Sequence, residues 1–137
     1  MEISDQPTLL EFSSHPSTQG TLTVAQTVRE LPFQPRRVYW TTSIPRHAKR
    51  GGHAHREISE VLVCLHGRCR VRTRDPHGGD ELWRLDNPSQ GLLIPPGWWR
   101  DLDEFEDDSV MLVMASGCYD EQEYIRDPER FFVTPQP

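Results

Sequence analysis

No run of apolar residues in this 137-residue chain approaches the ~20 that a membrane-spanning helix requires. Residues 1–6 are polar and acidic, which does not fit a secretory signal or a transit peptide. With 21 acidic against 15 basic side chains, the chain also lacks the basic field typical of nucleic-acid-binding proteins. We therefore expect a cytoplasmic protein that binds neither membrane nor nucleic acid. An anionic ligand stays compatible with a net charge of −6, because a pocket can be locally basic.

Cysteine is scarce, and its spacing excludes two common uses. The three cysteines Cys64, Cys69 and Cys118 form no C-x-x-C pair, so neither a zinc knuckle nor a thioredoxin-like site is expected. Cys64 lies inside an apolar run and Cys118 follows one. This placement favours small buried hydrophobes in a reducing compartment.

Helical patterning is almost absent. The 12 prolines and nine glycines are spread along the chain and separate short runs rich in Val, Leu, Thr and aromatics. These runs predict strands at residues 8–12, 21–28, 37–42, 60–65, 69–73, 81–85, 91–94 and 110–115. Turns are expected between them, including residues 15–20, and the acidic run 101–108 is expected to be a solvated loop. One or two helical turns are expected within residues 120–131, so the pattern predicts an all-β sandwich or small barrel.

The most informative segment is Arg50-Gly51-Gly52-His53-Ala54-His55, followed by Glu60 and Gly67. Side chains alternate between faces along a strand, so His53 and His55 are expected to point the same way. The pattern H-x-H, four residues, E, six residues, G is similar to the first motif of cupins.

A second segment resembles the other cupin motif, P-x-G-x-x-H. It reads Pro95-Pro96-Gly97-Trp98-Trp99-Arg100, with Arg100 in place of the final histidine. The two motifs in this order imply a cupin, that is, a double-stranded β-helix or jelly-roll barrel with a short C-terminal helical turn. We expect a single cupin domain over residues 1–137, with its core at about 31–132 and N-terminal strands that a dimer can exchange.

Further segments resemble one cupin family, the dTDP-4-keto-6-deoxyhexose 3,4-ketoisomerases or sugar nucleotide oxoisomerases. They are residues 36–39, 50–56, 61–67, 91–96, 110–116, 119–121 and 123–127. The resemblance implies an isomerase of deoxysugar biosynthesis that moves the ketone of a dTDP-linked keto-deoxy sugar from C4 to C3. It also implies that the enzyme uses no metal and no other cofactor, and that it is a homodimer.

Histidine chemistry suits this reaction. The C3 proton lies next to the C4 ketone, and its removal gives an enediol, which becomes a 3-ketone when a proton returns to C4. Histidine is a base near neutral pH. The hypothesis is that His55 abstracts the C3 proton and His53 moves protons between O3 and O4, or that the two roles are reversed.

Substrate binding is assigned to a second set of residues. Arg50 is a candidate for the diphosphate, because a guanidinium bonds two phosphate oxygens at once. Tyr39 is a candidate donor to a sugar or phosphate oxygen, and one of Trp98 and Trp99 is expected to line the pocket. The substrate-binding candidates together are Arg37, Tyr39, Arg50, Glu60, Trp99 and Arg100.

Four positions depart from the family pattern. Arg100 replaces a histidine, Glu60 a glutamine and Leu93 a tyrosine, while Ser17-Thr18-Gln19-Gly20 replaces an Asp-x-Arg-Gly segment. Arginine is no base near neutral pH, yet it can stabilise an enediolate or bind phosphate. The departures indicate a divergent pocket.

Two alternatives remain open. In a metal-dependent small cupin enzyme, His53, His55 and Glu60 would form a two-histidine, one-carboxylate site. A positive Arg100 facing that site would repel a divalent cation. In a non-catalytic cupin, the same pocket would only bind a nucleotide sugar.

Overall fold

The computed structural model describes residues 4–132. The ends of the expected domain, residues 1–3 and 133–137, lie outside this range. Strands make up most of the described chain. They are β1 (Thr8–Glu11), β2 (Ser13–Ser17), β3 (Gly20–Val24), β4 (Arg37–Ile44), β5 (Arg50–His55), β6 (Glu60–His66), β7 (Cys69–Arg74), β8 (Asp80–Leu85), β9 (Gln90–Ile94), β10 (Trp99–Asp103), β11 (Ser109–Ala115) and β12 (Tyr124–Ile125). The 3₁₀-helix η1 (Glu121–Glu123) and the helix α1 (Pro128–Phe131) confirm short helical turns near the C-terminus.

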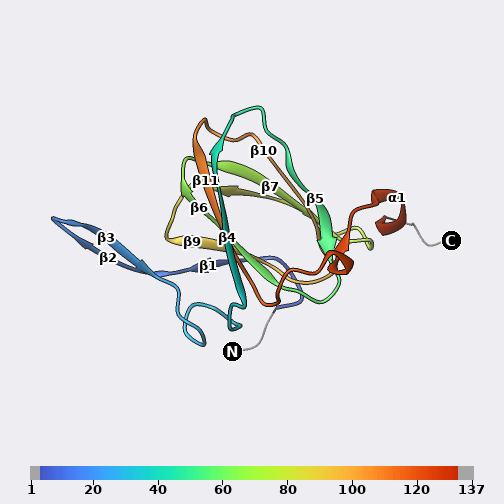
Figure 1. Cartoon of the computed structure of the whole chain (residues 1–137), viewed down its shortest axis with the longest axis horizontal. Coiled ribbons are helices and arrows are strands. Elements are labelled where there is room, and N and C mark those ends of the chain that lie inside the picture. Colours follow the sequence, from blue (N-terminus) through green and yellow to red (C-terminus); the bar gives the residue numbers. More distant parts are fainter. Residues whose placement is uncertain (1–3, 133–137) are drawn as a thin grey trace.

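Ten of these strands form two antiparallel sheets that enclose a barrel (Figure 1). The first sheet has the order β1-β9-β6-β11-β4 and the second the order β12-β5-β10-β7-β8. This arrangement confirms the all-β jelly-roll expected from the sequence. No helix in residues 4–132 is long and apolar enough to cross a membrane.

The main core fills the space between the sheets. In β7, Cys69, Val71 and Thr73 are buried, while the arginines that alternate with them face outward, as the period of two requires. Strand β6 differs, because its run Glu60–Cys64 is buried on both faces. Its outward Val61 and Val63 belong to a second apolar cluster with Phe12, Leu31, Phe33, Leu93 and Met114. The sequences of the strands at the centre of this sheet are therefore continuous runs of apolar residues.

The outer face of the second sheet carries charge pairs. Arg70 bonds Asp103 at 2.8 Å and Arg74 bonds Asp101 at 3.0 Å, both between β7 and the neighbouring β10. The prediction of a solvated loop over residues 101–108 is therefore wrong for residues 101–103, which lie in β10. The acidic side chains there are the outward partners of the arginines on the adjacent strand.

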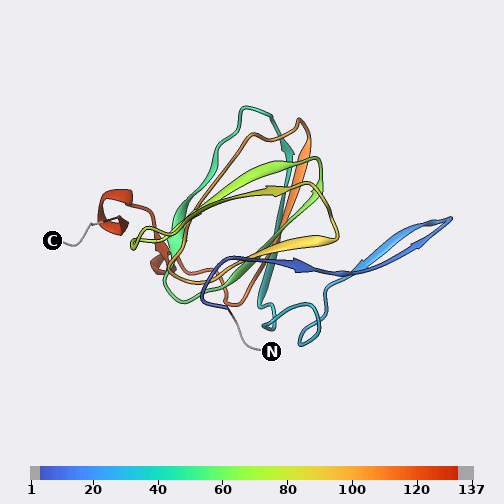
Figure 2. The ribbon, with the colours of Figure 1, turned by 180° about the vertical axis from the view of Figure 1, so that it is seen from behind.

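The N-terminal region contains a second difference. Residues 15–17 belong to β2, which pairs with β3 as a hairpin, so the predicted turn at residues 15–20 is shorter than expected. The predicted strand 21–28 ends at Val24. The hairpin extends away from the barrel, at the side opposite to α1 (Figures 1 and 2).

Candidate active site

Strand β5 places two histidines inside the barrel. Near its start, after Arg50, Gly51 and Gly52 have φ values of +80° and +71°, opposite an irregularity in the pairing with β10. A Cβ atom on Gly51 would lie 2.7 Å from the backbone oxygen of Arg100, so only glycine allows the two strands to approach this closely. The remaining alternation directs His53 and His55 to the same face, as predicted.

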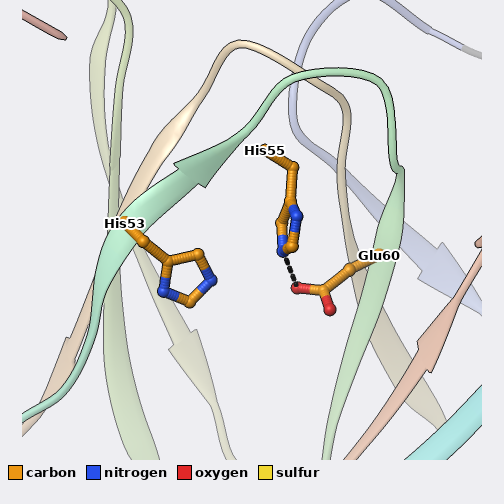
Figure 3. A group of neighbouring side chains, drawn as sticks. All are labelled: His53, His55 and Glu60. Carbon is orange, nitrogen blue, oxygen red and sulfur yellow. Dashed lines mark ion pairs between the residues drawn. The ribbon is translucent and has the colours of Figure 1, made fainter. Parts of the chain in front are cut away.

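The two imidazole rings lie edge to face, with 5.0 Å between their centroids. Glu60, at the start of β6, points toward them from the adjacent sheet (Figure 3). Its Oε1 lies 3.3 Å from Nε2 of His55. Since His55 is 0% and Glu60 1% exposed, this pair is shielded from water.

Glu60 also contacts three other residues. Arg100 Nη1 donates to Oε1 at 2.8 Å, and the Tyr39 hydroxyl donates to Oε2 at 2.9 Å. Arg37 Nη2 lies 3.6 Å from the same Oε2. Burial by itself raises the pKa of Glu60, but the contact with His55, the charge of Arg100 and the Tyr39 hydrogen bond outweigh it and lower that pKa to about 2. The carboxylate is therefore ionised near neutral pH.

His53 has the opposite environment. Burial, followed by the positive charge of Arg100 and by neighbouring His55, lowers the pKa of His53 to about 4. Its imidazole is therefore neutral near pH 7. Among the described residues, all four ring nitrogens of the two histidines are buried and make no hydrogen bond, although Nε2 of His55 faces Glu60. Buried polar atoms are normally paired, so the other three nitrogens indicate a place for a ligand.

A cavity connects this cluster with the surface. Its buried end is formed by Glu60 and Arg100, and Arg50 lies at its exposed end. Arg50 Nη2 is 3.4 Å from Thr41 Oγ1. The lining consists of Tyr39, Thr41, Arg50, Gly51, His53, Glu60, Leu62, Arg100, Leu102, Met111 and Val113. His55 lies behind this lining, against Glu60.

The structure brings most of the predicted substrate-binding residues to this cluster, but not Trp99. Because Trp99 and Arg100 are consecutive in β10, they face opposite sides of the sheet. Trp99 packs against Phe131 of α1 at 5.5 Å between ring centroids. Trp98 does not line the cavity either, and its indole nitrogen donates to the backbone oxygen of Asp5.

Tyr124 contacts the histidines although no role was predicted for it. Strand β12 pairs with β5 and sets Tyr124 opposite His55. The ring centroid of Tyr124 lies 4.9 Å from that of His53 and 4.6 Å from that of His55. Arg37 Nη2 donates to its hydroxyl at 3.3 Å. The only sequence signal was its membership of the family-like segment 123–127.

The four positions where the sequence leads us to expect a departure from the family pattern separate into two groups. Glu60 and Arg100 face the cavity and contact each other. Leu93 is buried in the apolar cluster on the outside of the first sheet, and residues 17–20 form the far end of the projecting hairpin. Within this chain, therefore, only the first two departures change the cavity.

A metal ion has a possible set of ligands here. One ligand atom from each of His53, His55 and Glu60 lies within 4.8 Å of the others. However, both oxygens of Glu60 already accept hydrogen bonds, and a permanently charged guanidinium lies 2.8 Å from one of them. A divalent cation would have to displace Arg100, which makes this donor set a poor fit for a metal.

Comparison with known proteins gives consistent matches. Residues 5–135 match the family model FdtA, described as WxcM-like, C-terminal. The TDP-4-oxo-6-deoxy-α-D-glucose-3,4-oxoisomerase of Aneurinibacillus thermoaerophilus is 37% identical over 123 residues, which are 90% of this chain and 88% of that protein. The crystal structure of QdtA, a sugar 3,4-ketoisomerase from Thermoanaerobacterium thermosaccharolyticum, in complex with TDP has a TM-score of 0.88. Its identity is 34%, and the match covers 93% of this chain and 92% of QdtA.

A variant of QdtA, with one histidine replaced by asparagine, was solved in complex with TDP-4-keto-6-deoxyglucose. It has a TM-score of 0.89 and 32% identity, and the match covers 95% of this chain and 94% of that one.

Proposed function

Because the chain belongs to the FdtA family, we propose that it is a sugar nucleotide 3,4-ketoisomerase, which moves the ketone of a TDP-linked 4-keto-6-deoxyhexose from C4 to C3. The observation that carries this proposal is the pair of neighbouring imidazoles inside the barrel. Both ring nitrogens of His53 and Nδ1 of His55 are buried and have no partner among residues 4–132. The relatives that are 3,4-ketoisomerases, one of them in complex with the keto sugar, support the same reaction.

The proposed reaction needs only proton transfers. His55 takes the C3 proton, and the electron pair of that C–H bond forms a C3–C4 double bond while the C4 carbonyl oxygen becomes an enediolate oxygen. His53 transfers the O3 proton to O4. The proton that His55 holds then returns to C4, which leaves the ketone at C3 and both histidines neutral. The ionised Glu60 beside His55 favours its charged form after proton abstraction. A neutral imidazole has one nitrogen that accepts a proton and one that donates a proton. His53 can therefore carry a proton from one oxygen to the other.

The remaining residues are proposed to bind the substrate. Arg50, at the exposed end of the cavity, is placed to bind the diphosphate. Arg100 provides a positive charge at the buried end, where the enediolate forms. Tyr39 and Arg37 complete this end through their contacts with Glu60.

The test is proton NMR of the protein with TDP-4-keto-6-deoxyglucose in deuterated buffer that contains a chelator. We expect loss of the C3 proton signal together with growth of a 3-keto product. His53→Asn and His55→Asn should each bind TDP and turn over slowly, whereas His77→Asn, in an exposed turn, should retain wild-type activity. If the folded protein leaves the spectrum unchanged, or if both histidine variants retain full activity, the proposal is wrong.

The same experiment separates the two alternatives. Activity that disappears in chelator and returns with a divalent cation would favour a metal-dependent cupin with His53, His55 and Glu60 as ligands. Thermal stabilisation by TDP without any turnover would favour a non-catalytic nucleotide-sugar-binding cupin.

We also propose that the chain is a cytoplasmic homodimer. The support for a dimer is an apolar groove on the outside of the first sheet, lined by Phe12, Ala25, Val63, Leu65, Leu112 and Met114 with the base of the β2–β3 hairpin. Beside it, Trp40 is 64% exposed on the edge strand β4. A second copy of this chain would cover these side chains and give the hairpin a surface to pack on.

A further inference from the structure

The carboxylate of Glu60 is fully engaged by the protein. Oε1 contacts Arg100 and His55, and Oε2 contacts Tyr39 and Arg37. Each oxygen accepts one hydrogen bond, from Arg100 or from Tyr39, and has a second nitrogen beside it, of His55 at 3.3 Å or of Arg37 at 3.6 Å. Glu60 is therefore surrounded by protein groups on both oxygens, although it borders the cavity.

Glu60 and Arg100 also depend on each other. Both are 1% exposed, and a buried guanidinium without a counter-charge is strongly unfavourable. Both are positions where the sequence leads us to expect a departure from the family pattern, and they are hydrogen-bonded to each other at 2.8 Å. In this chain the buried arginine therefore comes with its own carboxylate.

On the basis of the proposed function, we propose that Glu60 is a positioning residue that fixes His55 and Arg100 for the reaction and does not itself bind the substrate. An ionised carboxylate only accepts hydrogen bonds, so the nitrogen of His55 that faces it, Nε2, carries the proton. The other ring nitrogen, Nδ1, is then the one that accepts a proton, and it has no partner among the described residues. Through the same oxygen, Glu60 holds the guanidinium of Arg100 at the buried end of the cavity.

Substitutions at residue 60 separate positioning from simple stability. Glu60→Gln keeps an oxygen that can accept from both Arg100 and His55, whereas Glu60→Met keeps the length of the side chain without an acceptor. We expect kcat to fall by about 10-fold or more in Glu60→Met, as when a group that orients a functional histidine is removed. Glu60→Gln should recover a large part of the loss, and the Kd for TDP should be the same in both. Glu81→Met is the matched control, because Glu81 is exposed on β8 and has no hydrogen bond or ion pair within residues 4–132.

A spectroscopic measurement tests the same idea without turnover. Long-range ¹H–¹⁵N NMR of the imidazoles should show His55 as the Nε2–H tautomer in the wild type and in Glu60→Gln. Because Glu60→Met leaves Arg100 buried without a counter-charge, we add Arg100→Met and the double variant Glu60→Met/Arg100→Met, which removes both charges at once. Arg100→Met should retain the tautomer, and the double variant should lose it.

The two proposals fail in different ways. A wild-type protein that does not convert the keto sugar overturns the proposed function, while the tautomer experiment still reports on Glu60. If the double variant retains the Nε2–H tautomer, or if Glu60→Met keeps wild-type kcat, Glu60 is not a positioning residue.

Discussion

At the scale of single residues, Tyr124 restrains both histidines through its ring. The ring contacts both imidazoles, and the hydroxyl interacts only with Arg37 among the described residues. Tyr124→Phe, which keeps the ring, should therefore retain most of the activity. Tyr124→Ala should lower kcat, because both imidazoles gain freedom to leave their reactive positions. Steady-state kinetics of the two variants tests this, and equal losses in both would show that the hydroxyl matters more than the ring.

The pKa of His53 predicts how stability depends on pH. Its value falls from 6.5 for an ordinary histidine to about 4 in the folded protein, so the unfolded chain binds more protons between these two pH values. The contribution of His53 to the free energy of unfolding is thus complete above pH 6.5 and decreases as the pH falls toward about 4. Glu60, whose pKa is lowered from 4.5 to about 2, loses its contribution as the pH falls between these two values.

Denaturant titrations across this pH range measure the effect. The wild type should lose stability as the pH falls from 6.5 to about 4, and His53→Asn should show a flatter dependence. His77→Asn serves as the control, because it leaves the buried cluster intact. Parallel pH dependences for the wild type and His53→Asn would contradict the prediction.

The spacing of residues along the sequence predicted only those parts of the site that lie on one strand or within one motif. The H-x-H spacing alone places His53 and His55 on one face, and the cupin motif adds Glu60 and Arg100. The prediction for Trp99 was wrong because the sequence did not indicate a strand at β10. In a strand, side chains alternate between faces, so Trp99 and Arg100 lie on opposite faces. Tyr124 was missed because its position depends on the pairing of β12 with β5, which no local pattern encodes.

At the scale of elements, the close approach of β5 and β10 depends on Gly51. In Gly51→Ala, the added Cβ atom would lie 2.7 Å from the backbone oxygen of Arg100, and residue 51 would have to keep a φ of +80°. Gly52 is a matched control, because its φ is +71° but a Cβ atom added there would have no other atom within 4 Å. Gly52→Ala should cost about 1–2 kcal/mol for the backbone strain alone.

Gly51→Ala should cost more than about 3 kcal/mol, because strain and strand separation add, and should also lower kcat by moving His53 relative to Arg100. Thermal denaturation together with kinetics of both variants checks this difference. Similar melting temperatures for the two variants would show that the strands can separate here without penalty.

The elements that sequence patterns identified best are those buried on one or both faces. Strands β6, β7 and β11 were expected from short runs rich in Val, Leu and Thr. The strands β2 and β10 were read as a turn and a loop, because they are rich in polar residues. Their β conformation comes from partners elsewhere in the chain, which are β3 for one and the arginines of β7 for the other.

At the scale of the whole molecule, the proposed dimer predicts the effect of two surface changes. Leu22 in the hairpin and Trp40 on β4 are both 64% exposed, so their replacement does not disturb the core. Leu22→Asp and Trp40→Arg should convert a dimer into a monomer by placing a charge in the apolar contact. Light scattering coupled to size-exclusion chromatography measures the mass. Leu82→Arg, a similarly exposed position on the second sheet, should leave the dimer intact.

Dimeric mass in both Leu22→Asp and Trp40→Arg would place the interface elsewhere.

The closure of the barrel illustrates why this scale was the hardest to predict. The sheets join segments far apart in the chain, such as β1 with β9 and β12 with β5. The resemblance to a family predicted this topology, whereas the strand patterns alone allowed a sandwich or a barrel of several connectivities.

The position of Trp40 also has an optical consequence. Trp98 and Trp99 are buried and Trp83 is partly buried, whereas Trp40 faces solvent in the isolated chain. Dilution that separates a dimer would therefore shift the fluorescence emission to longer wavelength and increase quenching by acrylamide, with Trp40 as the main source of both changes. The protein thus carries an intrinsic fluorophore on the face where we propose that assembly occurs, and a Trp40→Phe variant would identify its share of the signal.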